Sequence, residues 1–230
     1  MKTSLFIALV GLLTLAACKQ DPGILITEER SLPSFTALEL GGAGKVLITQ
    51  DTTYAIRIEA GDRLMNYIET EVTNGKLRIW ERSNRFHNWK PVRYFVSAAY
   101  LDRIVLAGSG EITGNDFQTQ DLELILAGSG RIYVAADPAH TRAEITGSGQ
   151  IDVTGATQTL DLRITGSGEF ECRSFISDTT DVTITGSGRA VVNTTEALFA
   201  KISGSGDIWY YGNPPVVETN ISGSGTIQRK

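Results

Sequence analysis

The chain has 230 residues, of which 41% are hydrophobic and 8% are aromatic, so it is long enough to bury a substantial core. Its 26 acidic residues outnumber its 21 basic residues, and the net charge of −5 at pH 7 gives no reason to expect a nucleic-acid partner. Two cysteines exclude a disulfide-rich scaffold.

Residues 1–17 are typical of a secretory signal peptide. Lys2 precedes an apolar run at residues 5–15, which is too short to span a bilayer and ends in the sequence Leu-Ala-Ala-Cys. This ending resembles a bacterial lipobox, so we predict that Cys18 is lipidated and attaches the mature protein to a membrane. An ordinary signal peptide or a core segment is the alternative interpretation.

The residue that follows Cys18 is Lys19 and not an aspartate. In a Gram-negative cell this is compatible with transfer to the outer membrane, so we expect a lipoprotein of the cell envelope that faces the periplasm or the surface. We expect residues 18–30 to form the lipidated cysteine and a tether, and residues 31–230 to fold as one domain.

Residues 35–50 look like a degenerate copy of a later repeat, with Ala43 where other copies have serine. Residues 51–100 break the period. Two stretches in them alternate between apolar and polar side chains, Asn74-Gly75 is a hairpin signal, and residues 61–68 could form one helical turn. We expect extra strands here that widen the first rungs and cap that end of the stack.

A Gly-Ser-Gly triplet then recurs every 18 to 20 residues. Its first glycines are Gly108, Gly128, Gly147, Gly166, Gly186, Gly204 and Gly223. Such regular spacing is the signature of a solenoid. A β-propeller is the alternative, but each of its blades needs about 40 residues, twice this period.

Apolar residues hold fixed places around each triplet. Two residues before the first glycine stand Leu106, Leu126, Ile145, Ile164, Ile184, Ile202 and Ile221, and four residues after it stand Ile112, Ile132, Ile151, Phe170, Ala190, Ile208 and Ile227. Because these offsets are even, the apolar side chains and both glycines share the inner face of an extended chain, while the serine points outward.

The pattern predicts an all-β fold. We expect a single-stranded parallel β-helix of about eight rungs of 18–20 residues, right-handed as parallel crossovers nearly always are, with extra strands in the N-terminal half. The glycines would form tight corners between successive strands.

The chain also resembles a known family, the putative auto-transporter adhesin, head GIN domain family, found largely in lipoproteins of Bacteroidetes-type bacteria. The resemblance is carried by the Gly-Gly-Ala-Gly-Lys-Val-Leu-Ile-Thr-Gln opening at residues 41–50, by residues 67–72 and 75–77, by the Gly-Ser-Gly series, and by residues 211–215. It implies a β-helix fold and an envelope location, and it brings no set of catalytic residues.

Catalytic and metal-binding readings of the repeat find little support. A calcium-binding β-roll would need Asp two residues after the second glycine, where every copy is apolar, so we expect neither a metal nor another cofactor. Asp152 and Glu171 share an outward offset in adjacent copies and could act as an acid and base pair, although a solvated surface is the alternative. Cys172 has an inward offset, so we expect a buried, unreactive thiol.

Two places where the repeat is interrupted are the candidate contact sites. The first is a basic loop with Arg85, His87, Trp89 and Lys90, for which a solubilising hairpin is the alternative. The second contains the outward aromatics Trp209 and Tyr211, which could instead pack under the loop at residues 214–215.

The sequence therefore favours a non-catalytic binding platform, a candidate adhesin whose partner is a glycan or an envelope or surface protein. A carbohydrate-binding or polysaccharide-cleaving β-helix protein is the alternative, and a signalling or stress lipoprotein is a third interpretation. The sequence leaves the oligomeric state open.

Overall fold

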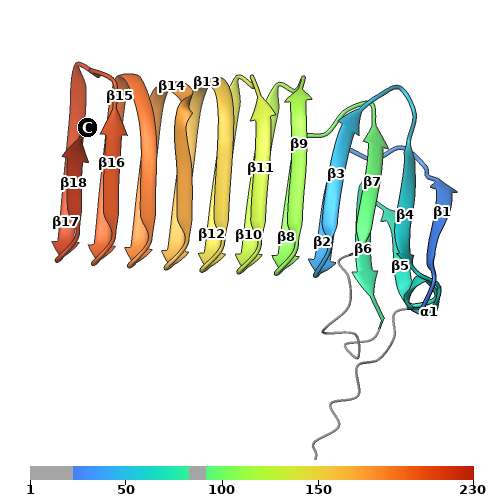
Figure 1. The fold of residues 1–230 in the computed structure, drawn as a ribbon. Coiled ribbons are helices and arrows are strands. Elements are labelled where there is room, and N and C mark those ends of the chain that lie inside the picture. The colour runs from blue at the N-terminus through green and yellow to red at the C-terminus, as the bar shows by residue number, and fades with distance from the viewer. Residues whose placement is uncertain (1–22, 83–91) are drawn as a thin grey trace, which may run out of the picture.

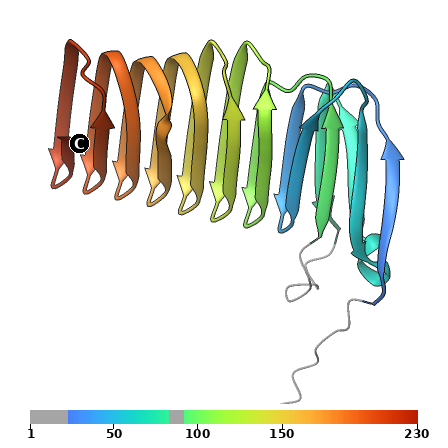
Figure 2. The same cartoon turned by 45° about the horizontal axis from the view of Figure 1, so that its top comes forward.

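The computed structural model describes residues 23–82 and 92–230 (Figure 1). The chain is nearly all β and forms a β-solenoid of about seven turns, close to the eight rungs predicted. Successive turns stack along one axis and build two facing walls (Figures 1 and 2). The parallel β-helix predicted from the repeat is confirmed.

The repeat region contains eleven strands. They are β8 (Arg103–Gly108), β9 (Glu111–Phe117), β10 (Asp121–Gly128), β11 (Arg131–Ala136), β12 (His140–Gly147), β13 (Gln150–Gly166), β14 (Glu169–Gly186), β15 (Arg189–Gly204), β16 (Asp207–Tyr211), β17 (Val216–Gly223) and β18 (Thr226–Arg229). Neighbouring copies pair in parallel, and the first glycine of each triplet lies beside the first glycine of the next copy. The register read from the triplets is therefore the register of the fold.

Side chains alternate between the core and solvent as their offsets require. Ile145, Ile164 and Ile184 are fully buried, and they stack on one another in successive rungs. A rung buries about four apolar side chains at roughly 1.5 to 3 kcal/mol each, which does not offset the chain entropy of its 18 to 20 residues. Stacking between neighbouring rungs therefore supplies the stability of the fold.

The N-terminal half holds the remaining elements. They are β1 (Leu25–Ser31), β2 (Ala37–Gly42), β3 (Lys45–Gln50), β4 (Ala55–Gly61), α1 (Asp62–Met65), β5 (Ile68–Thr73), β6 (Lys76–Glu81) and β7 (Arg93–Ala98). Gly42 pairs with Gly108, so the degenerate first copy is confirmed. The hairpin turn is confirmed by the positive φ angles of Asn74 and Gly75, 52° and 73°.

The expectation that residues 51–100 widen the first rungs needs correction. β6 and β7 run parallel to β2 and β3 on the side away from β8 and β9, so they add a rung to the stack. The spatial order of the rungs therefore differs from the chain order. The antiparallel strands β1, β4 and β5 and the short helix α1 then close this end, as predicted.

The predicted tether at residues 18–30 was too long. β1 begins at Leu25 and pairs with β4 over its whole length, from Leu25 opposite Gly61 to Ser31 opposite Ala55. The folded domain thus starts before residue 31. Cys18 lies outside the described residues. Within residues 23–82 and 92–230, no helix is long and apolar enough to cross a membrane.

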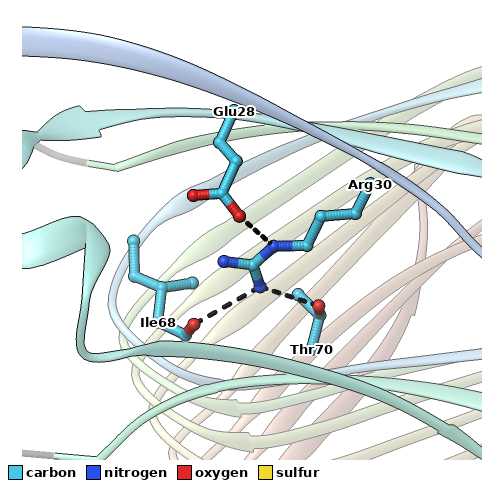
Figure 3. Close-up of polar contacts among 4 residues, drawn as sticks. All are labelled: Glu28, Arg30, Ile68 and Thr70. Atoms are coloured by element: carbon cyan, nitrogen blue, oxygen red, sulfur yellow. Dashed lines mark hydrogen bonds and ion pairs between the residues drawn. The ribbon is translucent and has the colours of Figure 1, made fainter.

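Arg30 links β1 to β5 at the N-terminal end of the solenoid (Figure 3). Its guanidinium group donates to the Glu28 carboxylate at 2.6 Å on β1, and to the Thr70 hydroxyl at 2.8 Å and the Ile68 carbonyl at 3.4 Å on β5. One side chain thus joins the end strands of both walls.

Candidate functional site

Trp209 and Tyr211 lie together on β16, and both point outward and are half-buried. The guanidinium carbon of Arg189 lies 4.8 Å from the centroid of the Trp209 ring, and the Lys230 ammonium lies 4.6 Å from it. The guanidinium carbon of Arg173 lies 4.5 Å from the Tyr211 ring, and the same group donates a hydrogen bond to the Tyr211 hydroxyl. These five residues form what we call the aromatic-cation cluster.

Sequence reasoning found the two aromatics and missed the three cations. Arg173, Tyr211 and Lys230 all stand seven residues after the first glycine of their copies, so they share one outward column. Arg189 lies one rung from Trp209, on a strand paired with β16. This shared outward offset is the signal in the sequence that points to the cluster.

The cations of the cluster differ in their pairing. Arg189 lies 3.3 Å from the Glu169 carboxylate. Lys230 donates to the side-chain oxygen of Gln228 at 3.2 Å, and within the described residues neither Lys230 nor Arg173 forms an ion pair with a carboxylate. Two positive charges beside the rings are therefore available to an anionic group.

Tyr133 is an outward aromatic that lies apart from the cluster. Tyr133 shares the column of Trp209, but Asp152, Glu171 and Val191 stand between them, so there is no continuous wall of aromatics. Arg85, His87, Trp89 and Lys90 lie outside the described residues. At the borders of that loop, Arg82 forms an ion pair with Glu69 and Arg93 lies 3.9 Å from Glu59.

The two carboxylates proposed as an acid and base pair do lie side by side. Asp152 pairs with Glu171 across β13 and β14. Partial burial raises the pKa of the Asp152 carboxyl above its usual value, the negative charge of Glu171 adds to the shift, and a hydrogen bond from Gln150 at 3.2 Å opposes it. The Oδ2 atom of Asp152 is buried and has no hydrogen-bond partner among the described residues. An oxygen buried in this way is poorly placed to exchange a proton with a bound substrate.

Hollows on the described surface are open to solvent. One of them lies over β8, β10 and β12, where Arg103 is 2.9 Å and Arg142 is 3.9 Å from the Glu123 carboxylate, next to His140. Within the described part of the chain, no group of three or more His, Cys, Asp or Glu residues is arranged to hold a metal ion.

Cys172 is fully buried, as predicted, and its thiol donates to the Val191 carbonyl at 3.0 Å. Burial raises the pKa of this thiol far above its usual value.

Comparison with solved structures gives the same fold. A putative adhesin from Bacteroides fragilis NCTC 9343 is 24% identical, with a TM-score of 0.87 over 91% of this chain and 99% of that chain. A putative lipid binding protein from Parabacteroides distasonis ATCC 8503 is 23% identical, with a TM-score of 0.70 over 90% of this chain and 97% of that one. A putative adhesin from Parabacteroides merdae ATCC 43184 is 21% identical, with a TM-score of 0.70 and coverage of 90% and 97%.

A comparison with curated proteins found no match. The family model described as "Putative auto-transporter adhesin, head GIN domain" matches residues 34–214. This span includes the degenerate first copy, the cap elements β4, α1 and β5, and most of the repeat. The chain belongs to the putative auto-transporter adhesin, head GIN domain family.

Proposed function

We propose that this protein is a non-catalytic adhesion platform of the cell envelope, and that the aromatic-cation cluster is its contact surface. The observation that carries the proposal is the gathering of Arg173, Arg189, Trp209, Tyr211 and Lys230 on one outward wall near the C-terminal end. The names of the family and of two of the solved neighbours support the adhesin role.

The chemistry of the cluster fits a partner with acidic groups. Tryptophan, tyrosine and arginine are the residues most often found at the energetic centres of interfaces. Arg189 and Lys230 already lie over the Trp209 ring, so a neutral sugar would have to displace them to stack there, whereas a carboxylate or sulfate could bind Lys230 in place. The partner we propose is therefore an acidic glycan or an acidic surface protein.

Rigid strands support this surface. The aromatics project from β16, which pairs in parallel with both β15 and β18, so little conformational freedom is lost when a partner binds.

Binding to an array of acidic and neutral glycans and to intact cells tests this contact surface. Trp209→Ala and Tyr211→Ala should each weaken binding by about 30-fold, the loss of about 2 kcal/mol typical of a hot spot. Tyr133→Ala, in the column of Trp209 but outside the cluster, should leave binding unchanged. Equal binding by all three variants would remove the cluster as the contact surface, and shortening of a bound polysaccharide would favour the enzyme alternative.

Attachment through Cys18 is the second part of the proposal. Cys18→Ser should move the protein from the membrane fraction to the soluble fraction and abolish labelling by a fatty acid. Protease treatment of intact cells then distinguishes the surface from the periplasm. Fatty-acid labelling that persists in Cys18→Ser would show that the lipid is attached elsewhere.

A further inference from the structure

Four strands end the two walls of the solenoid: β1 and β5 at one end, and β17 and β18 at the other (Figure 1). Within residues 23–82 and 92–230, each of these strands pairs with a single neighbour, namely β4, β6, β15 and β16 respectively. A strand edge without a partner is a template for another strand, and proteins commonly protect such edges with charges.

Three of the four strands carry protective charges. Arg30 and Glu28 lie across the end of β1 (Figure 3), and β5 contains Glu69 and Glu71. β18 is only four residues long and ends in Arg229, a charge at an inward offset that weakens pairing with a further strand. β17, with the sequence VVETNISG, has a single charged residue, and that residue has an outward offset.

β17 also exposes side chains that are buried in every earlier rung. Ile221 is 45% exposed, although Ile202 beside it is fully buried. Val217 is 41% exposed, and its neighbour Leu198 is fully buried. The apolar core thus continues to this edge without a covering rung among the described residues.

We propose that β17 pairs with β17 of a second copy of this chain, antiparallel, across a two-fold axis through Asn220. The pairing extends the wall by backbone hydrogen bonds and covers the exposed core residues. It does not depend on the function proposed for the aromatic-cation cluster, which lies on an outward wall.

Charge selects this register. Inward side chains lie opposite inward side chains only if the two opposed residues are both even-numbered or both odd-numbered. The two-fold axis must therefore pass through a residue position and not between two residues. An axis through Glu218 would place two carboxylates opposite each other. Thr219 and Arg229 are equally far from Ser224 at the corner, so they lie at the same height on the two walls. An axis through Thr219 would therefore place Arg229 opposite the partner's Arg229 on the other wall. The axis through Asn220 avoids both clashes.

Shape agrees with this register. With Asn220 on the axis, Ile221 lies opposite the partner's Thr219, and Val217 lies opposite the partner's Gly223. Each larger apolar side chain therefore faces a smaller residue. Glu218 lies opposite the partner's Ser222, where it meets no like charge.

The size of the contact predicts a weak dimer. β17 and β18 present eight and four residues, fewer than the roughly 20–30 residues a side of a standard interface. Because a two-fold contact uses the same patch on both copies, association stops at the dimer and no fibre forms.

Disulfide trapping tests the register directly. Residues 18–230 carrying Cys18→Ser and Asn220→Cys should form cross-linked dimers under mild oxidation, because directly opposed Cβ atoms lie about 4.5–5.5 Å apart, close to disulfide geometry. Thr183→Cys is the matched control, since it has the same offset in an interior rung. Cross-linking at least about 10-fold faster for Asn220→Cys than for Thr183→Cys is expected, and equal rates would overturn the proposal.

Sedimentation at protein concentrations up to about 1 mM gives an independent measurement. The chain should pass from monomer to dimer and no further. Val217→Lys, which supplies β17 with the missing charge, should remain monomeric, whereas the outward Val216→Lys should still dimerise. A monomer at every concentration, an assembly larger than a dimer, or a dimer that survives Val217→Lys would each contradict the proposal.

The position of β17 gives this pairing a second consequence, which rests on the proposed attachment through Cys18. β1, which follows that anchor, lies at the opposite end of the solenoid from β17 (Figure 2). Copies paired through β17 therefore have their anchored ends far apart, as in copies held on two facing membranes. Vesicles that carry the lipidated protein should cluster, and vesicles that carry Val217→Lys should stay dispersed. A soluble dimer without vesicle clustering would refute the facing-membrane arrangement and leave the pairing intact, while loss of vesicle binding would instead refute the anchor.

Discussion

A β-carbon on Gly128 would lie 2.3 Å from the carbonyl oxygen of Gly108, the equivalent glycine one rung earlier. Gly128 also has a φ of 135°, which residues with side chains rarely adopt. The corner therefore requires glycine for both its backbone angle and its contact with the neighbouring rung.

Gly128→Ala should lower the free energy of unfolding by about 2 kcal/mol or more, because it adds a backbone strain of about 1–3 kcal/mol to a steric clash with a main chain that cannot move alone. Urea unfolding followed by circular dichroism measures the loss. Ser129→Ala, at the exposed tip of the same triplet, should change stability by less than about 0.5 kcal/mol. Similar effects of the two substitutions would contradict the assignment of roles within the triplet.

Much of this fold could be predicted because each rung repeats the same constraint. A register error would move Ile164 from the core to solvent, and the same error would appear in every copy. The period therefore establishes the register, the corners and the buried columns without knowledge of any long-range contact.

Features that occur once could not be read from the period. The rung formed by β6 and β7 stacks on the side of β2 and β3 that faces away from the later rungs, although β6 and β7 follow β2 and β3 in the chain. Thr180 and Thr141 are both buried in a column that has leucine at Leu160 and Leu198. Their hydroxyl contacts differ, because Thr180 contacts Ser177 at 2.5 Å and Thr194 at 2.7 Å, whereas Thr141 donates to Thr157. These contacts depend on the segments that join the two walls, where the register between β14 and β15 shifts.

The candidate site shows the same division. Trp209 and Tyr211 stood out as exposed aromatics, but Arg173 reaches Tyr211 from two rungs away. Such a contact depends on side-chain reach across stacked rungs, which alternation along one strand does not describe.

Asp152 predicts a dependence of stability on pH. Burial raises the pKa of its carboxyl in the folded state above its usual 3.8, so the folded protein binds this proton more tightly than the unfolded chain does. The stabilisation from binding this proton is complete at pH values below the pKa of Asp152 in the unfolded chain. It is lost as the pH rises through the pKa of Asp152 in the folded protein. At neutral pH the ionised carboxylate thus disfavours folding.

Asp152→Asn should therefore stabilise the protein at pH 7, by less than about 1 kcal/mol because the group is partly exposed and solvent screens it. The gain should vanish near pH 3, where both forms are neutral. Urea unfolding of both proteins across this range measures the difference. Glu144→Gln, which removes a half-buried outward carboxylate in an interior rung, is the control. An unchanged or reduced stability of Asp152→Asn at pH 7 would contradict the prediction.

Arg30 predicts how the N-terminal end opens. Its guanidinium group satisfies Glu28 on β1 and both Thr70 and the Ile68 carbonyl on β5, with 24% of the side chain exposed. Arg30→Lys keeps the charge but lacks the planar group that reaches three acceptors at once, so about 1–2 kcal/mol of stability should be lost. Native-state hydrogen exchange measures the effect locally, and the amides of β1 and β5 should exchange faster while those of β13 and β14 keep their protection. Arg163→Lys, on an exposed outward position, should leave exchange unchanged throughout. If Arg30→Lys accelerated exchange equally in all rungs, the side chain would stabilise the whole solenoid rather than fasten its end.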